Sequence, residues 1–294
     1  DEVYDTALTA DLTVIEESNE FLDRFSKNEN LPLFTSCCPA WVKFAENKYP
    51  ELSKNISSCK SPQQMFGTVA REVFNKKDEE DGKKTFIVSI MPCTAKKAEA
   101  ARPEFNHDGV REVDVVLTTQ ELAIMIKEIG VNFHTIEEES LDMPFGVASG
   151  AGIIFGTTGG VTEAVLRKLL KDKFAKDDCE IIFNSVRGLE AVKEATVEAD
   201  GRIISIAVVH GLKDADMLIK QIKNGEKYYD LVEVMACKGG CIAGGGQPVP
   251  RIITKETRAM RSSGLYNIDK VNQIKNSEDN YIVKSIYKDI IKGN

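Results

Sequence analysis

A glycine-rich segment near the end of the chain carries two cysteines that could bind a metal cofactor. The segment MACKGGCIAGGGQP, residues 235–248, places Cys237 and Cys241 four residues apart and contains five glycines. So many glycines predict that something bulky lies directly against the main chain, where side chains would not fit. Zinc is the nearest alternative, but zinc knuckles more often have the spacing C-x-x-C. The two thiols therefore predict further cysteine ligands elsewhere in the chain.

The chain has seven cysteines, namely Cys37, Cys38, Cys59, Cys93, Cys179, Cys237 and Cys241. A chain of 294 residues does not need disulfides for stability, and two adjacent cysteines are a poor pattern for pairing. Iron–sulfur clusters are commonly held by four cysteine thiolates. We expect Cys38, Cys93, Cys237 and Cys241 to be these ligands, with Cys37 left over. Isolated Cys59 and Cys179 are predicted to be small buried core residues.

Alternating strands and helices predict an α/β fold with some parallel sheet. The expected strands are 31–36, 84–93, 111–119, 179–188, 202–212 and 231–237. The expected helices are 10–28, 39–49, 61–77, one from Thr94, 120–130, 161–172, 214–225 and two near 254–265 and 279–292. A glycine-rich loop is expected at 148–160. Cys38, Cys93 and Cys237 each follow an apolar strand. Because sites form at the carboxyl ends of strands in open α/β sheets, we expect three strands to bring these thiols together.

Composition and charge exclude several classes of protein. The net charge is −8, which argues against binding of nucleic acid. We find no apolar run of membrane-spanning length and no signal-peptide pattern, so no membrane insertion is expected. The cysteines favour a reducing, cytoplasmic and anaerobic location. Lysines in GKKTF and TAKKAE could form a basic patch that docks an acidic electron carrier.

Three segments together resemble the signature motifs of one enzyme family. TSCCPAW (35–41), MPCTAKKAE (91–99) and the segment 235–248 resemble those of the catalytic domain of [FeFe]-hydrogenases. The likeness continues in ADLTVIEE, SPQQMFG, SGAGIIFGTTGGVTEA and RGLEAVKEA, and covers roughly residues 10–250. It implies reversible reduction of protons to H₂ at an H-cluster. This cofactor joins a [4Fe–4S] cubane to a di-iron unit that carries carbonyl, cyanide and azadithiolate ligands.

The resemblance also implies a role for individual residues. Cys38, Cys93, Cys237 and Cys241 would hold the cubane, and the sulfur of Cys241 would also bridge to the di-iron unit. Cys37 would exchange protons with the dithiolate amine. Lys96 would donate a charge-assisted hydrogen bond to a cyanide. The other expected cofactor contacts are Met91, Met235, Phe155, Pro92 and Gln63, although without the resemblance the two methionines would be read as core residues.

A charged stripe on the first predicted helix suggests a proton path. Glu17, Glu20 and Arg24 share one face because they lie at i, i+3 and i+7. Read alone, this stripe is a solvated helix face. The resemblance instead implies a relay through Arg24, Glu20, Ser57, Glu17 and Cys37.

Some features depart from the family pattern. Ala40 stands where glycine is usual and Lys238 where proline is usual, and neither the family's N-terminal Ala-Pro segment nor a C-x-x-C-x-x-C run for accessory clusters is in the sequence. A second chain could supply the missing family segments. Alternatively, these segments could have been removed or not included, or the chain could be an unusually small member of the family.

We expect one domain, 1–294, of two closely packed lobes with the active site between them. The lobes are approximately 1–110 with the C-terminal helices, and 111–250. The expected partners are ferredoxin or another redox protein, maturation proteins, and possibly the second chain. Two alternatives stay open: an H₂ sensor with slow turnover, and a non-catalytic iron–sulfur assembly protein.

Overall fold

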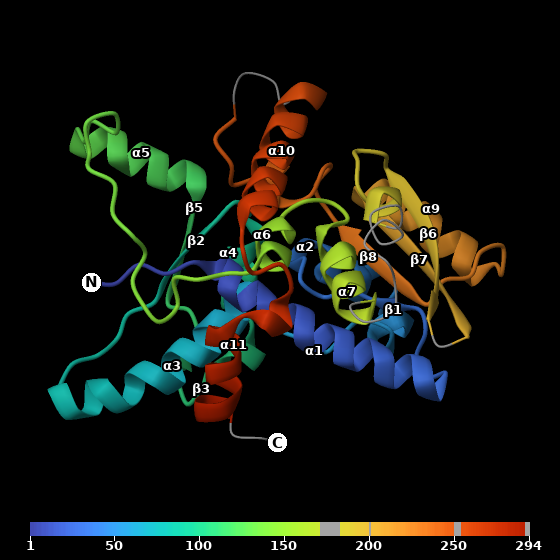
Figure 1. The fold of residues 1–294 in the computed structure, drawn as a ribbon, viewed down its shortest axis with the longest axis horizontal. Coiled ribbons are helices and arrows are strands. Elements are labelled where there is room, and N and C mark those ends of the chain that lie inside the picture. The colour runs from blue at the N-terminus through green and yellow to red at the C-terminus, as the bar shows by residue number, and fades with distance from the viewer. Residues whose placement is uncertain (171–182, 200, 250–253, 292–294) are drawn as a thin grey trace.

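The computed structural model describes residues 1–170, 183–199, 201–249 and 254–291. It has the predicted α/β class, with sheets flanked by helices. Figure 1 shows a four-stranded sheet at one end of the molecule and helix α5 (Thr119–Ile129) at the other. Among the described residues, none of the helices combines the length and the apolar composition needed to cross a bilayer.

The larger sheet has the order β1-β8-β7-β6. Its strands are β1 (Leu33–Phe34), β8 (Leu231–Met235), β7 (Arg202–His210) and β6 (Val192–Ala199). The first three run parallel, and β6 pairs antiparallel with β7. Because β1 and β8 are parallel neighbours, the segments that follow them, with Cys38 and Cys237, leave the sheet at the same edge.

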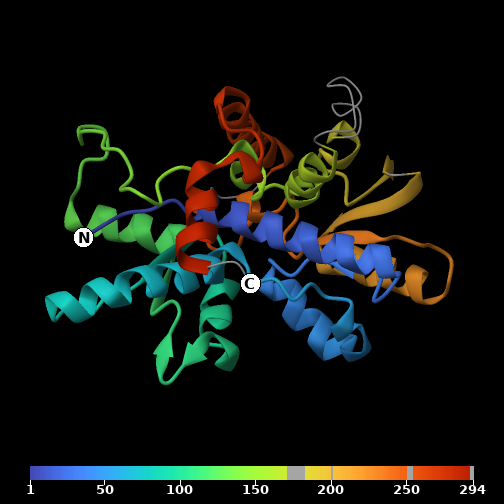
Figure 2. The same ribbon diagram turned by 60° about the horizontal axis from the view of Figure 1, so that its bottom comes forward.

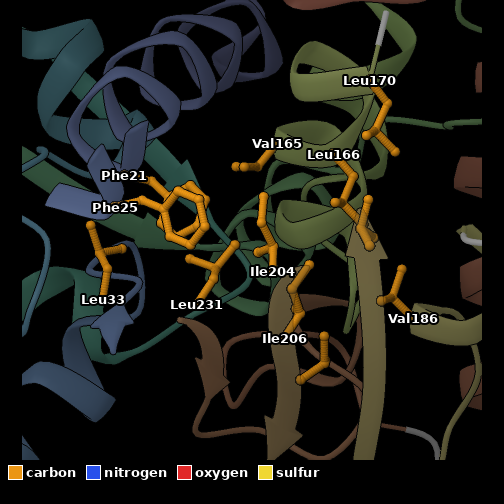
Figure 3. Packing of buried hydrophobic residues seen from close by; sticks show 12 residues of the cluster. Phe21, Phe25, Leu33, Val165, Leu166, Leu170, Val186, Ile204, Ile206 and Leu231 are labelled. Atoms are coloured by element: carbon orange, nitrogen blue, oxygen red, sulfur yellow. The ribbon is translucent and has the colours of Figure 1, made fainter. Parts of the chain in front are cut away.

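Helices cover both faces of this sheet. Side chains on β7 alternate, so that Ile204, Ile206 and Val208 face α1 (Thr6–Lys27) and α7 (Gly160–Leu170). Figure 3 shows Phe21 and Phe25 of α1 packing against Leu33 and Leu231 from the strands. On the other face, Ala207 and Val209 pack in a second cluster with Trp41 of α2 (Pro39–Lys48) and with α9 (Leu212–Lys223). The sheet is therefore the middle layer of an α/β/α arrangement.

A smaller parallel sheet lies toward the other end and carries the second cysteine segment. It consists of β2 (Val88–Met91) and β5 (Val115–Thr118). Helices α3 (Pro62–Asp81) and α4 (Ala95–Ala100) pack against it, and the hairpin of β3 (Asn106–His107) with β4 (Val110–Arg111) precedes β5 along the chain. Helix α5 follows β5 directly, and a capping box between Thr118 and Glu121 sets its start. Single-turn helices complete the chain: η1 (Pro50–Lys54), η2 (Pro103–Phe105), η3 (Cys241–Ala243) and η4 (Ser277–Asp279).

The C-terminal segment is fastened to the core by buried polar groups. It comprises α10 (Lys255–Val271), α11 (Tyr281–Ile286) and a π-helical turn (Tyr287–Ile291). Figures 1 and 2 show α10 at the top of the molecule and α11 near the middle, next to α1. The fully buried carboxylate of Asp11 accepts hydrogen bonds from Ser277 Oγ (2.8 Å) and Asn280 Nδ2 (2.9 Å). It also accepts from the backbone N–H of Ser149 (2.9 Å), just before α6 (Gly150–Ile154). One side chain of α1 thus joins α6 to the C-terminal segment.

Several expectations about elements were wrong. Residues 183–186 are helical, so the strand predicted at 179–188 is absent there, while 179–182 lie outside the described residues. The antiparallel strand β6 was not expected, and the loop predicted at 148–160 contains α6, which Ser149 caps. The three cysteine-bearing strands, for which no common sheet was predicted, lie in two sheets, because β2 pairs with β5 instead of with β1 or β8. The division into two lobes stays a prediction.

Candidate metal centre

Four cysteines from three separate segments lie close enough to influence one another electrostatically. Cys38 is the N-cap of α2, Cys93 follows β2, Cys237 follows β8 and Cys241 opens η3. Burial raises the pKa of the Cys237 and Cys241 thiols, and the neighbouring Cys38 and Cys93 raise both pKa values further. Burial also raises the pKa of Cys38, whose sulfur accepts the Ala236 N–H at 3.4 Å. The four cysteines are therefore near enough to interact electrostatically, and their role as ligands of one cluster stays a prediction.

The donor set has the chemistry of an iron–sulfur site. Because burial raises the pKa of Cys38, Cys237 and Cys241, these thiols would lose their protons only beside a positively charged group, and iron in a cluster would supply one. Within the described part of the chain, no three His, Cys, Asp or Glu side chains form a group that could hold one metal ion. The residues that could hold a larger cluster are the four cysteines, each from a loop or helix start.

The glycines of the third segment pack against the backbone of the second cysteine segment. A Cβ on Gly244 would lie 2.0 Å from the Pro92 carbonyl oxygen, and one on Gly246 would lie 2.8 Å from the Cys93 nitrogen. The Gly246 N–H donates to the Pro92 oxygen at 3.0 Å. These two glycines were expected to make room for a cofactor, whereas the structure shows them joining two cysteine segments. They still fix Cys93 relative to Cys241, since each segment carries one of these thiols.

Cys37 is packed in a buried, mostly apolar cluster near these cysteines. Its side chain is 7% exposed and packs in one cluster with Val14, Phe155 and Met235. Burial raises its pKa well above the ordinary value, and nearby Glu17 raises it further. Cys37 is therefore a neutral thiol in this structure, able to hold a proton.

Lys96 is a buried cation that reaches the Cys37 segment. Its Nζ donates to the Cys37 carbonyl oxygen at 3.1 Å and to the Glu99 carboxylate at 2.9 and 3.1 Å. Burial alone would lower the pKa of Lys96, but Glu99 outweighs it, so the pKa is raised. Gln63 Nε2 donates to the Lys96 carbonyl oxygen (3.2 Å) and to Glu99 (3.1 Å). Met91, by contrast, packs in a different cluster from Met235, with Ile87 and Val116.

The structure places the five residues of the predicted relay near one another, and their role as a proton path stays a prediction. Arg24 Nη2 donates to Glu20 Oε1 at 2.6 Å, and Ser57 Oγ donates to Glu20 Oε2 at 2.6 Å. Ser57 also interacts with Glu17, and Glu17 interacts in turn with Cys37. Glu17 is fully buried, and among the described residues its Oε2 has no hydrogen-bond partner. The chain of polar groups therefore runs from the surface side at Arg24 to Cys37.

The two glutamates have opposite protonation preferences. Burial raises the pKa of Glu17 to about 8, more than hydrogen bonds from Ser36 and Ser57 lower it. Burial also raises the pKa of Glu20, but hydrogen bonds from Ser57 and Ser58 and the charge of Arg24 outweigh it, so the net shift is downward. At neutral pH, Glu17 consequently holds a proton that the anionic Glu20 lacks.

Sequence reasoning missed several buried groups near the site. Glu233, fully buried on β8, accepts from the N–H groups of Gly159 (2.6 Å) and Thr162 (2.8 Å). The sequence feature that could have revealed Glu233 is a single charged residue inside the otherwise apolar strand LVEVM. For Glu99, the signal was its i+3 spacing from Lys96. Asp11 gave no such signal.

Three further sequence features can be placed. Cys59 was predicted to be a core residue, but its sulfur lies 3.6 Å from Glu20 Oε2, beside the relay. Cys179 lies outside the described residues. Of the two departures from the family pattern, Lys238 is exposed and Ala40 is half-buried.

Two protein-family models match the chain. The model described as "Iron only hydrogenase large subunit, C-terminal domain" matches residues 1–245. The model described as "Iron hydrogenase small subunit" matches residues 255–294. The C-terminal segment, which is hydrogen-bonded to the Asp11 carboxylate, therefore matches a family model of its own.

Curated relatives include iron hydrogenase 1 of Clostridium pasteurianum, 44% identical over 98% of this chain and 51% of that protein. The periplasmic [Fe] hydrogenase large subunit of Nitratidesulfovibrio vulgaris is 46% identical over 84% of this chain and 59% of that protein. A cytosolic Fe–S cluster assembly factor of Danio rerio is 33% identical over 84% of this chain and 63% of that protein. The chain spans about half the length of the hydrogenases it matches.

Solved structures give the same result. An apo [FeFe]-hydrogenase variant of Chlamydomonas reinhardtii superposes with a TM-score of 0.78 and 35% identity, covering 98% of this chain and 80% of that chain. Another, described in work on stepwise assembly of the H-cluster, has the same TM-score and coverage at 36% identity. With the family match over 245 residues, these findings show that the chain belongs to the [FeFe]-hydrogenase family and forms its catalytic domain.

Proposed function

We propose that this chain catalyses the reversible reduction of protons to H₂. The main observation behind the proposal is that four thiols lie near a fifth, that of Cys37. Cys37 in turn stands at the end of a series of acidic side chains. Cys38, Cys93, Cys237 and Cys241 would hold the [4Fe–4S] cubane of an H-cluster, with Cys241 as the ligand nearest the di-iron unit. When bound, the H-cluster, with its carbonyl, cyanide and azadithiolate ligands, would supply the metal site for hydrogen chemistry and would pass on the two electrons that a redox partner donates for each H₂ formed.

The remaining residues keep the pocket dry and electrically balanced. Phe155 and Met235 exclude water beside Cys37, because all three pack in one buried cluster. Met91, Pro92 and Gln63 would be further contacts of the cofactor, with Met91 in the separate cluster of Ile87 and Val116 and Gln63 hydrogen-bonded to Lys96 and Glu99. Lys96 supplies a positive charge for an anionic cyanide, while Glu99 holds its ammonium group in place.

Protons reach Cys37 through the side chains of the relay. The Glu20 carboxylate takes a proton from the surface beside Arg24, and Ser57 passes it on to Glu17. Support comes from the pKa values, since Glu17 is the site that retains a proton while Glu20 is the anion. Cys37, a neutral thiol, is the last holder of the proton.

The partners follow from this function. We propose ferredoxin or a similar redox protein as electron donor, and dedicated maturation proteins as the source of the di-iron unit. A second chain that supplies further segments of the longer relatives stays part of the proposal. A cytoplasmic, anaerobic setting is also a proposal, since one relative is described as periplasmic and another as cytosolic.

The test is to reconstitute the chain with iron and sulfide, add a synthetic di-iron complex, and measure H₂ evolution with a reduced viologen. We expect infrared bands of bound carbonyl and cyanide together with H₂ evolution. A Cys37→Ala variant should keep the bands and lose most of the turnover. Bands without turnover in the unmodified chain would instead indicate a sensor.

The second candidate function is assembly of iron–sulfur proteins without hydrogen chemistry. The 33% identity to an assembly factor over 84% of the chain favours it. In that case the reconstituted chain would bind iron and sulfide but develop no carbonyl or cyanide bands. That single result would overturn the hydrogenase proposal.

A further inference from the structure

A buried histidine contacts the loop between the last two proposed ligands. His210 ends β7 and is 4% exposed. The backbone N–H of Gly239 donates to its Nδ1 at 2.5 Å. The other ring nitrogen, Nε2, lies 2.9 Å from the carbonyl oxygen of Glu190. Gly239 lies two residues from both Cys237 and Cys241.

These two partners allow one tautomer of the ring. A backbone N–H can only donate, so Nδ1 must carry the lone pair that accepts. A carbonyl oxygen can only accept, so Nε2 must carry the proton. With both nitrogens occupied, His210 has no lone pair left to bind a metal and no free position from which to pass a proton.

The two peptide groups that flank the Gly239 Cα are each held by a hydrogen bond. While His210 binds the N–H of Gly239, the Gly239 carbonyl oxygen accepts the backbone N–H of Thr158 at 3.2 Å. Gly239 and Gly240 both have positive φ, +95° and +88°, a conformation that glycine adopts without strain. A Cβ on Gly240 would also lie 2.7 Å from the Thr158 nitrogen. Two successive glycines could adopt many other conformations, so external contacts must select this one.

We infer that His210 is a positioning residue for the third cysteine segment. Its Nδ1 fixes the orientation of the Lys238–Gly239 peptide, and this sets the distance and direction between the Cys237 and Cys241 sulfurs. The strand register supports the role, because His210 pairs with Met235, two residues before Cys237. The inference rests on the proposed function only in that Cys237 and Cys241 bind the cluster.

The test measures how fast iron leaves the chain reconstituted with iron and sulfide, before any di-iron complex is added. Iron release to a coloured chelator is followed in His210→Leu, His210→Asn and His210→Gln. Removing a contact that orients a metal ligand typically weakens metal binding 10- to 100-fold, so we expect release from His210→Leu to be about 10- to 100-fold faster. The oxygen of asparagine takes the place of Nδ1, whereas that of glutamine lies nearer Nε2. We therefore expect His210→Asn to be slower than His210→Gln.

Val197→Ala is the matched control. Val197 is buried in the cluster of β7 and α7, away from the cysteine segments, so its truncation lowers stability without touching the loop. Its iron release should match that of the unmodified chain. Should His210→Leu also match it, or should the Asn and Gln variants release iron equally fast, the inference is overturned. An unmodified chain that binds no cluster would refute the proposed function instead.

Discussion

The protonation of Glu17 can be tested by the pH dependence of stability. In the fold, burial raises the pKa of Glu17 from 4.5 to about 8. The folded chain therefore keeps a proton that the unfolded chain releases between these two values. Because the raised pKa belongs to the folded state, the stabilising contribution is complete below about pH 4.5 and is lost as the pH rises toward 8.

The magnitude follows from the size of the shift. Each pKa unit corresponds to about 1.4 kcal/mol, so between about pH 5 and pH 8 this group lowers the free energy of unfolding by about 3 kcal/mol. Glu17→Gln replaces the acid with a neutral side chain of the same shape. We therefore expect the difference in the free energy of unfolding between the variant and the unmodified chain to grow by about 3 kcal/mol as the pH rises from about 5 to about 8, with the variant becoming the more stable.

The assay is urea unfolding of the metal-free chain at several pH values, with both proteins measured in parallel. Glu137→Gln, at an exposed position, is the control and should give a curve parallel to that of the unmodified chain. A parallel curve for Glu17→Gln as well would refute the reasoning. Glu17 would then be ionised in the folded chain, and the proton of the relay would rest elsewhere.

Three other changes have defined outcomes. Glu20→Ala should lower viologen-driven H₂ evolution about 100-fold or more, since it removes the proton carrier, and should leave the infrared bands unchanged. Asp11→Ala should lower the free energy of unfolding by about 3–5 kcal/mol and expose the C-terminal segment to protease, because buried donors lose their acceptor. Exposed Asp23→Ala, on the same helix, is the control for both and should change neither measurement. Gly244→Ala should lower the iron bound per chain at least about twofold, because its Cβ would overlap the Pro92 oxygen, whereas Gly245→Ala, with only Thr94 Oγ1 at 3.6 Å, should bind iron normally.

Most helices were predictable because each carries local signals. Pro39 and Pro62 stand at the first helical positions of α2 and α3, and Gly130 ends α5 in the left-handed conformation. Strands β7 and β8 were predictable from their apolar runs. Strand β6 was missed because its sequence VKEATVEA is rich in charge, and its place depends on pairing with β7.

The sequence by itself determined the chemistry of the candidate site. Cysteine type, order and neighbours predicted the family and the five thiols, and these features belong to short segments. Only the tertiary structure decided that β2 lies in a different sheet from β1 and β8, and that the glycines at 244 and 246 contact the backbone at Pro92 and Cys93. It also decided that Glu17 holds a proton while Glu20 does not. The physical reason is that burial and long-range pairing set these properties, and neither is written in the spacing of residues along the chain.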